Sequence, residues 1–216
     1  MCSADPSVKT PLKGTAFLFT AGPNGGTPGA TGMCGFQNAQ LPKDLMYGAI
    51  DSKLFGIAAH CGGCLRVNSG ATNVEVEIID IIQPLSDAHG YTISVDSLAM
   101  AKLAPSGGNP DVQFSFVPCS FSGNIQLAFR GSLDPSVTVM NHVNQLKSIQ
   151  LTTPSVSVSF TRQDYNLWTP PTSFKFGGGA VNLDLTDIFD NVVHLPNLTV
   201  STALKDSGKQ FPKCPQ

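Results

Sequence analysis

Alternating apolar and polar residues predict that most of the regular structure in this chain is short β-strand. The segment Val74–Asp80 begins with an alternation of period two, which is the spacing of a strand with one buried face. Further strands are predicted at 14–20, 65–67 and 112–117. Residues 21–32 are rich in glycine, proline and threonine, and they predict a long loop.

Two segments of the first half predict helices instead. Apolar residues near helical spacing predict a helix within Asp44–Gly56, with Asp44 as its candidate N-cap. A second, short helix is predicted over Asp96–Leu103. Both helices are brief, so the predicted fold class is all-β.

The second half predicts only short strands, separated by turn residues at intervals typical of a β-sandwich. A boundary is expected at Ser120–Gly123, which divides the chain into domains at 1–121 and 122–216. The strand candidates of the second domain are 124–130, 136–141, 147–152, 156–161, 172–176, 181–185 and 191–194.

Composition narrows the class of protein. Only 13% of the residues are charged, the formal net charge is −2, and lysine and arginine are scattered singly. A nucleic-acid partner needs clustered cations, so none is expected. No apolar stretch approaches the ~20 residues of a membrane span. Six cysteines with so few charges favour a disulfide-stapled, secreted protein of the extracellular space.

The cysteines occur in three motifs, which read Met33-Cys34-Gly35-Phe36, Cys61-Gly62-Gly63-Cys64 and Val117-Pro118-Cys119. A zinc site is disfavoured because a second Cys/His pair at suitable spacing is missing. A thioredoxin-type redox site is disfavoured because no βαβ pattern surrounds the middle motif. Disulfide formation is the favoured interpretation.

The order and setting of these motifs resemble the N-terminal barrel of the expansins, proteins that loosen plant cell walls without cutting them. In the second half, Val137–His142 resembles a family strand that ends in Asn-His, and Asp164-Tyr165-Asn166 falls in family order. The resemblance is to microbial expansins and covers nearly the whole chain. It implies a six-stranded double-psi β-barrel followed by an immunoglobulin-like β-sandwich that acts as a carbohydrate-binding module.

The resemblance also implies a pairing of the cysteines. It suggests the disulfides Cys34–Cys61 and Cys64–Cys119, which leaves Cys2 and Cys214 to pair with each other. Cys2 has an alternative interpretation, as the lipid-bearing cysteine of a bacterial lipoprotein.

Comparison with glycosidases predicts that the chain is not an enzyme. Cleavage of a glycosidic bond usually needs two carboxyl groups, and the related family-45 endoglucanases carry their base on the first barrel strand. Here Thr15–Thr20 contains no acidic residue. Asp96 and Asp80 are instead candidate polysaccharide-binding residues. The alternatives are that Asp96 caps a helix and that Asp80 anchors a turn.

Aromatic residues are the other candidates for polysaccharide binding, because flat rings stack on the apolar faces of sugars. Tyr165 is retained from the family's aromatic platform, and Trp168 lies three residues later. The alternative for Trp168 is packing beneath Pro170-Pro171. Among the family features that are lost, Phe17 replaces a threonine of the first strand and Leu133-Asp134 replaces a pair of aromatics.

The expected function is non-hydrolytic loosening of plant-type cell walls by a secreted protein. The expected partner is cellulose or a related β-glucan, with xylan as a further candidate, bound along an open groove. The alternative is a diverged homologue that serves as a structural or matrix carbohydrate-binding protein without loosening activity. No cofactor and no metal are implied, and a monomer in the cell wall or matrix is expected.

Overall fold

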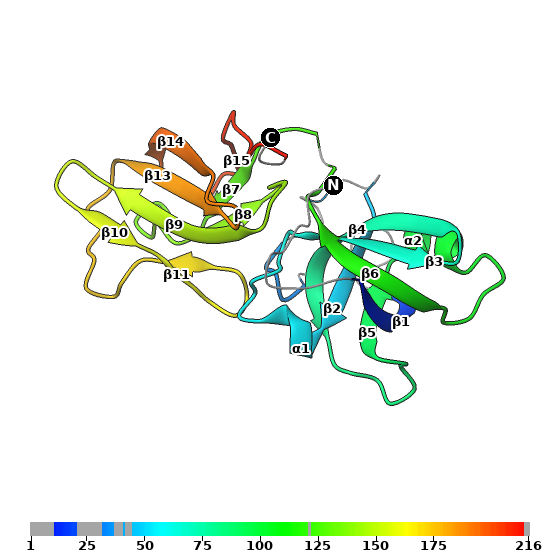
Figure 1. The fold of residues 1–216 in the computed structure, drawn as a ribbon. Helices are drawn as coiled ribbons and strands as arrows, with labels where there is room; N and C mark the ends of the chain where they lie inside the picture. The colour runs from blue at the N-terminus through cyan, green and yellow to red at the C-terminus, as the bar shows by residue number, and fades with distance from the viewer. Residues whose placement is uncertain (1–10, 21–31, 37–40, 42–44, 121, 214–216) are drawn as a thin grey trace. The chain divides into compact units, whose positions relative to one another are not determined.

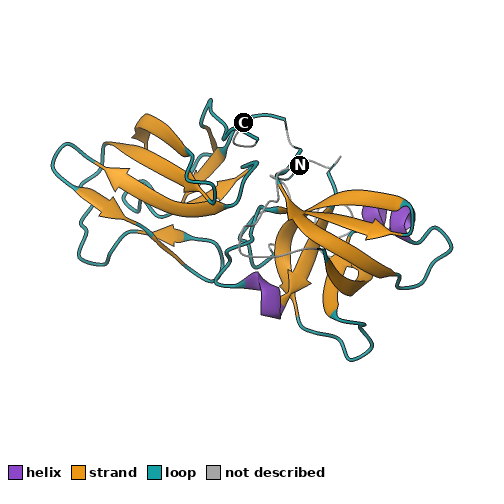
Figure 2. Ribbon diagram, in the orientation of Figure 1, coloured by secondary structure: helices purple, strands orange, loops and turns teal. Residues whose placement is uncertain are grey.

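The computed structural model describes residues 11–20, 32–36, 41, 45–120 and 122–213. The chain forms two compact units. The first contains the described residues up to Gly56 together with His60–Cys119, and the second contains Ile57–Ala59 and the described residues from Ser120 onward. Strands dominate both units (Figure 2), so the predicted all-β class is confirmed.

The first unit is a closed six-stranded barrel with the strand order β1-β5-β2-β4-β3-β6 (Figure 1). The pairs β1–β5 and β2–β4 are parallel, and the other neighbours are antiparallel. The predicted six-stranded barrel is therefore confirmed, while its double-psi crossing stays a prediction. The strands are β1 (Leu12–Leu18), β2 (Tyr47–Asp51), β3 (Cys64–Ser69), β4 (Thr72–Ile82), β5 (Tyr91–Val95) and β6 (Asp111–Val117).

The helix predicted within Asp44–Gly56 is confirmed only near its end, because Tyr47–Asp51 is strand β2 rather than helix. All five residues of β2 are buried, so the segment is a fully covered strand whose apolar spacing imitates a helix. A Cβ atom on Gly48 would lie 2.2 Å from the carbonyl oxygen of Ser94, so glycine permits close strand pairing here. Only α1 (Ser52–Phe55) is helical, and Asp51 is its N-cap. Asp44 lies outside the described residues.

The second predicted helix is confirmed as α2 (Ser97–Leu103), which Asp96 caps. Strand β5, directly before it, was not predicted, although Tyr91–Val95 is rich in β-branched residues. Both implied disulfides of the barrel, Cys34–Cys61 and Cys64–Cys119, are present. Cys2 and Cys214 lie outside the described residues, as does most of the loop predicted at 21–32.

The second unit contains a four-stranded sheet, β10-β9-β13-β14, and a five-stranded sheet, β11-β12-β8-β7-β15. A continuous cluster of buried apolar residues forms its core. A two-sheet unit is thus present, and its immunoglobulin-like topology stays a prediction. The strands are β7 (Gln126–Phe129), β8 (Val137–Met140), β9 (Leu146–Thr152), β10 (Ser157–Ser159), β11 (Thr161–Arg162), β12 (Trp168–Thr169), β13 (Ala180–Asp187), β14 (Val192–Thr199) and β15 (Lys205–Asp206).

Two of the strand candidates of the second unit differ from the observed strands. The candidate at 156–161 divides into β10 and β11, and residues 172–176 form turn and coil in a segment with prolines on one side and glycines on the other. Strand β14 lies at the edge of its sheet. Its pairing with β13 shifts register between Val181 and Leu183, opposite Pro196 in the middle of β14.

Candidate functional site

Asp80 ties a cysteine-bearing segment to strand β4. Its Oδ1 accepts hydrogen bonds from the backbone N–H groups of Met33 and Ile81, both at 2.8 Å. A Cβ atom on Gly32 would lie 2.2 Å from the carbonyl oxygen of Ile79, so the segment crosses β4 in close contact. The half-buried Asp80 carboxylate therefore anchors a turn, as the structural alternative proposed.

Asp96 is a buried helix cap. Its Oδ1 accepts from the N–H of Ala99 and its Oδ2 from the N–H of Tyr47, each at 3.0 Å. The residue is 1% exposed, so the carboxylate joins helix α2 to strand β2 rather than facing solvent. The capping alternative is confirmed, and this geometry offers no surface to a glucan.

The two aromatic candidates lie in different environments. Tyr165 is 43% exposed, in the turn between β11 and β12. Trp168 is 3% exposed and belongs to the apolar core of the second unit. The guanidinium carbon of Arg162 lies 4.3 Å from the centroid of the Trp168 ring, a cation–π contact. The Trp168 ring is thus covered by core residues and by Arg162, an environment that fits the alternative of a packing role.

A buried polar network closes the hairpin between β13 and β14, and sequence reasoning missed it. Asp187 is fully buried and accepts hydrogen bonds from the Nδ2 atoms of Asn144 and Asn191 at 2.7 and 2.8 Å. It also accepts from the N–H groups of Phe189 and Asn191 at 2.9 Å. These four bonds satisfy the carboxylate, so we assign Asp187 a structural role.

Burial shifts the pKa of two further groups in opposite directions. Burial raises the pKa of Glu77, on strand β4, to about 8. Burial lowers the pKa of His142, after strand β8, to about 4, and the charge of Arg162 lowers it further, against an opposing hydrogen bond to Asn144. The Nδ1 of His142 lies 2.8 Å from the Asn144 carbonyl oxygen and donates to it, because a carbonyl oxygen only accepts. At neutral pH both side chains are mainly uncharged.

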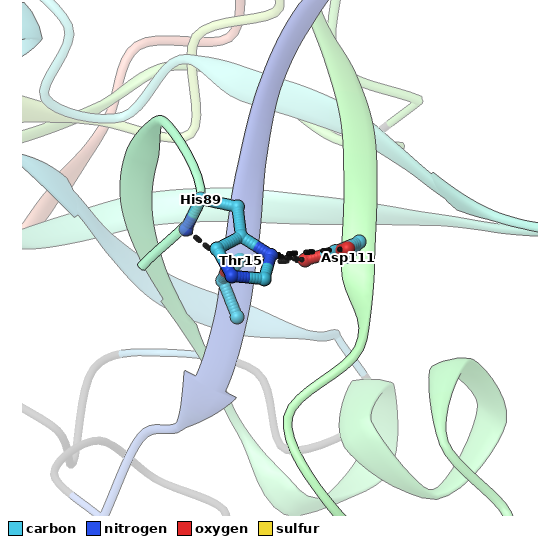
Figure 3. Close-up of polar contacts among 3 residues, drawn as sticks. All are labelled: Thr15, His89 and Asp111. Atoms are coloured by element: carbon cyan, nitrogen blue, oxygen red, sulfur yellow. Dashed lines mark hydrogen bonds and ion pairs between the residues drawn. The ribbon is translucent and has the colours of Figure 1, made fainter. Parts of the chain in front are cut away.

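The barrel also carries an open polar cleft, with a volume of about 450 Å³, that sequence reasoning missed. His89, from the loop before β5, and Asp111 of β6 both line the cleft. Their side chains lie side by side (Figure 3), with the Nδ1 and Oδ1 atoms 3.0 Å apart. Thr15 of β1 contacts both residues. No local motif could have indicated this cluster, since Thr15 and Asp111 are 96 positions apart and meet only through the pairing of β1 with β6.

The described residues contain no group of three or more His, Cys, Asp or Glu side chains that could hold a metal ion. Cys61 and Cys64, considered above as ligands, are both in disulfides. Within the same part of the chain, no helix is long and apolar enough to span a membrane.

Similar proteins were found by sequence, although no protein-family model matches the chain. Expansin-like protein 5 of Dictyostelium discoideum is 27% identical over 222 residues, which cover 97% of this chain and 89% of that protein. Expansin-like protein 3 of the same organism is 28% identical over 198 residues, covering 85% of this chain and 58% of that protein.

Solved structures with the same fold come from a bacterium. The apo crystal structure of the Clavibacter michiganensis expansin matches with a TM-score of 0.80 at 20% identity, covering 94% of this chain and 99% of that one. An aspartate-to-asparagine variant of that expansin, in complex with cellohexaose, matches with a TM-score of 0.77. The Dictyostelium proteins resemble this chain in sequence, and the bacterial expansin resembles it in fold. The resemblance of this chain to the expansin family is therefore confirmed over nearly its whole length.

Proposed function

We propose that this chain is a secreted, non-hydrolytic, expansin-like protein that binds cellulose or a related β-glucan and loosens it. In such a process the protein binds a glucan chain along its surface and weakens that chain's lateral hydrogen bonds to its neighbours. We further propose that the two-sheet unit, residues 122–216, serves as the carbohydrate-binding module. The protein is expected to act as a monomer in the cell wall or matrix.

The observation that carries this proposal is similarity along the whole chain to expansins, one of which was crystallised with cellohexaose. The exposed ring of Tyr165 supports it, because that residue retains the family's aromatic position and remains accessible. The two disulfides fit an extracellular protein.

The environment of Asp96 supports the absence of hydrolysis. A glycosidase acid must reach the glycosidic oxygen, and its partner carboxylate must reach water or the anomeric carbon. Both oxygens of Asp96 instead accept backbone hydrogen bonds below the surface. Strand β1 contains no acidic residue that could act as the base.

A binding protein without loosening activity is the second candidate function. Specific observations favour it, since Phe17 replaces a threonine, Leu133-Asp134 replaces the aromatic pair, and Trp168 is buried. The Asp134 Oδ1 accepts from the Ser136 N–H at 3.0 Å, so this replacement organises its own loop. The sugar-binding platform is thus reduced to Tyr165 among the predicted aromatics.

Depletion isotherms on cellulose and xylan test the binding. We expect weak adsorption of the wild type to crystalline cellulose. Tyr165→Ala should weaken it about tenfold, because one stacked ring contributes about 1.4 kcal/mol. Leu204→Ala is the matched control, since Leu204 is equally exposed in the same unit. Leu133→Trp should strengthen adsorption by a similar factor if the platform lies beside that loop. Submicromolar wild-type binding that Tyr165→Ala leaves unchanged would contradict the assignment.

Two further assays separate the candidate functions. Soluble reducing ends should not accumulate from cellulose, xylan or mixed-linkage glucan, and steady release that Asp96→Asn abolishes would refute the non-hydrolytic proposal. Extension of cell-wall strips under constant load then distinguishes loosening from binding alone. Adsorption without extension favours the second candidate function.

A further inference from the structure

A row of polar side chains crosses three neighbouring strands of the barrel at the cleft described above. Gln113 of β6 is in register with Lys13 of β1 on one side and with Asn68 of β3 on the other. Neighbouring strands are about 4.8 Å apart, so Lys13 and Asn68 each lie roughly 5 Å from Gln113 and roughly 10 Å from each other. All three line the cleft, together with His89 and Asp111.

A buried hydroxyl holds His89 and Asp111 in place at the cleft (Figure 3). Thr15 Oγ1 accepts from the His89 backbone N–H at 2.8 Å and lies 3.3 Å from Asp111 Oδ1, to which it donates. Thr15 is 4% exposed, whereas the His89 and Asp111 side chains are 80% and 69% exposed. Fixed exposed groups supported by a buried partner reduce the ordering cost of binding a ligand.

The hydrogen-bonding character of the cleft indicates the ligand class. When the His89 Nδ1–H donates to Asp111, the Nε2 of the neutral ring is an acceptor. Asp111 also accepts, Lys13 donates, and the amides of Asn68 and Gln113 do both. One lysine and one aspartate give no net field that would select a charged ligand. Hydroxyl groups, which both donate and accept, match this set.

We propose that this cleft is a second saccharide subsite, which binds one or two neutral hexose units of a soluble oligosaccharide or of a glucan chain end. The identity of the sugar as a β-glucan rests on the proposed function. The volume of about 450 Å³ lies within the range of small-molecule sites. Asp111 and Gln113 contact adjacent hydroxyls, and Thr15 acts as a positioning residue.

The cleft is separate from the residues that the family resemblance singled out. Gly70, which lines the cleft, precedes strand β4, and Asp80 lies ten residues later, roughly 30 Å along the extended chain. His89 precedes strand β5, whereas Asp96 follows it. The polar residues at the cleft end of β4 and β5 therefore differ from Asp80 and Asp96 at the other end. Those at the cleft end are the more exposed.

Titration of the full chain with cellobiose and cellohexaose, followed by NMR signals of the His89 imidazole, tests the subsite. We expect saturable shifts, and at least a fivefold weaker affinity in Asp111→Asn and in Gln113→Ala. Asp87→Asn is the matched control, because Asp87 is an exposed carboxylate of the same loop that does not line the cleft. Thr15→Val should weaken binding and Thr15→Ser should restore it, which a merely structural role in folding would not predict once both variants are shown to be folded.

The design separates this subsite from the proposed function. Tyr165→Ala should leave the cellobiose shifts at His89 unchanged. Cellulose adsorption without any His89 shift would overturn the subsite and leave the proposed function intact. His89 shifts without cellulose adsorption would do the reverse. A larger His89 response to inorganic phosphate than to cellobiose would also overturn the assignment, because it would identify the cleft as an anion site.

Discussion

The barrel and the two-sheet unit are stabilised by different means. The barrel carries both disulfides of the described residues, and it buries a carboxyl group, Glu77, that is mainly protonated at neutral pH. The two-sheet unit relies on a continuous apolar core and on a buried polar network around Asp187. One of its buried titratable groups is a neutral histidine, His142. The stability of the two units should therefore respond differently to reductant and in opposite directions to pH.

Among the substitutions, removal of a disulfide should cause the largest loss of stability, and this loss should be confined to the barrel. The Cys64–Cys119 bond closes a loop of 55 residues, which corresponds to about 4 kcal/mol on the chain-entropy account. The double variant Cys64→Ser, Cys119→Ser should lose this much stability in the barrel, measured by hydrogen exchange. Trp168 is the sole tryptophan and is buried in the second unit, so its fluorescence reports that unit alone. An equal loss of stability in the second unit, detected by Trp168 fluorescence, would contradict the prediction that the effect is confined to the barrel.

The buried network of the second unit gives the next largest effect. Asp187→Asn replaces one acceptor oxygen by a donor that faces other donors, and it should cost about 3 kcal/mol in the free energy of unfolding. Asp190→Asn is the matched control. The exposed side chain of Asp190 forms a surface ion pair with Lys147, so its change should cost less than about 1 kcal/mol. Denaturant unfolding followed by Trp168 fluorescence measures both, and equal costs would show that the network is unimportant.

Glu77 should make the barrel less stable as pH rises. Between pH 4.5 and about 8, the folded barrel binds a proton that the unfolded chain has released. The free energy of unfolding therefore decreases with rising pH in this window, by about 1.4 kcal/mol per pH unit. Glu77→Gln should remove this dependence, as seen in hydrogen exchange of the barrel across the window. An unchanged slope in the variant would exclude Glu77 as its source.

His142 should have the opposite effect on the second unit over a narrower window. Between pH 6.5 and about 4, the unfolded chain binds a proton that the folded unit excludes. The free energy of unfolding therefore decreases as pH falls, again by about 1.4 kcal/mol per pH unit. His142→Asn keeps a donor for the Asn144 carbonyl and should flatten the Trp168-detected dependence. If acid stabilised both units alike, the contrast between them would fail.

Local pattern predicted much of the fold, but not the residues' environments. The alternation of apolar and polar residues, together with β-branched residues, correctly predicted β4 and β6. Strand β2 was not predicted, because all of its residues are buried and its sequence therefore shows no apolar–polar alternation. The disulfides of the barrel followed from the family resemblance and not from spacing. Whether Asp96 or Trp168 reaches solvent depends on tertiary packing, which neither residue's sequence context reveals.

Strand β14 has a consequence for behaviour at an insoluble surface. An edge strand of eight residues is a template onto which a neighbouring copy could add its own strand. The proposed adsorption to a glucan fibre would bring such copies close together. Pro196 lacks an N–H group, and the register shift at that point breaks the regular ladder. The edge therefore offers a poor template for strand pairing between copies. Molecules crowded on a fibre should stay monomeric rather than aggregate.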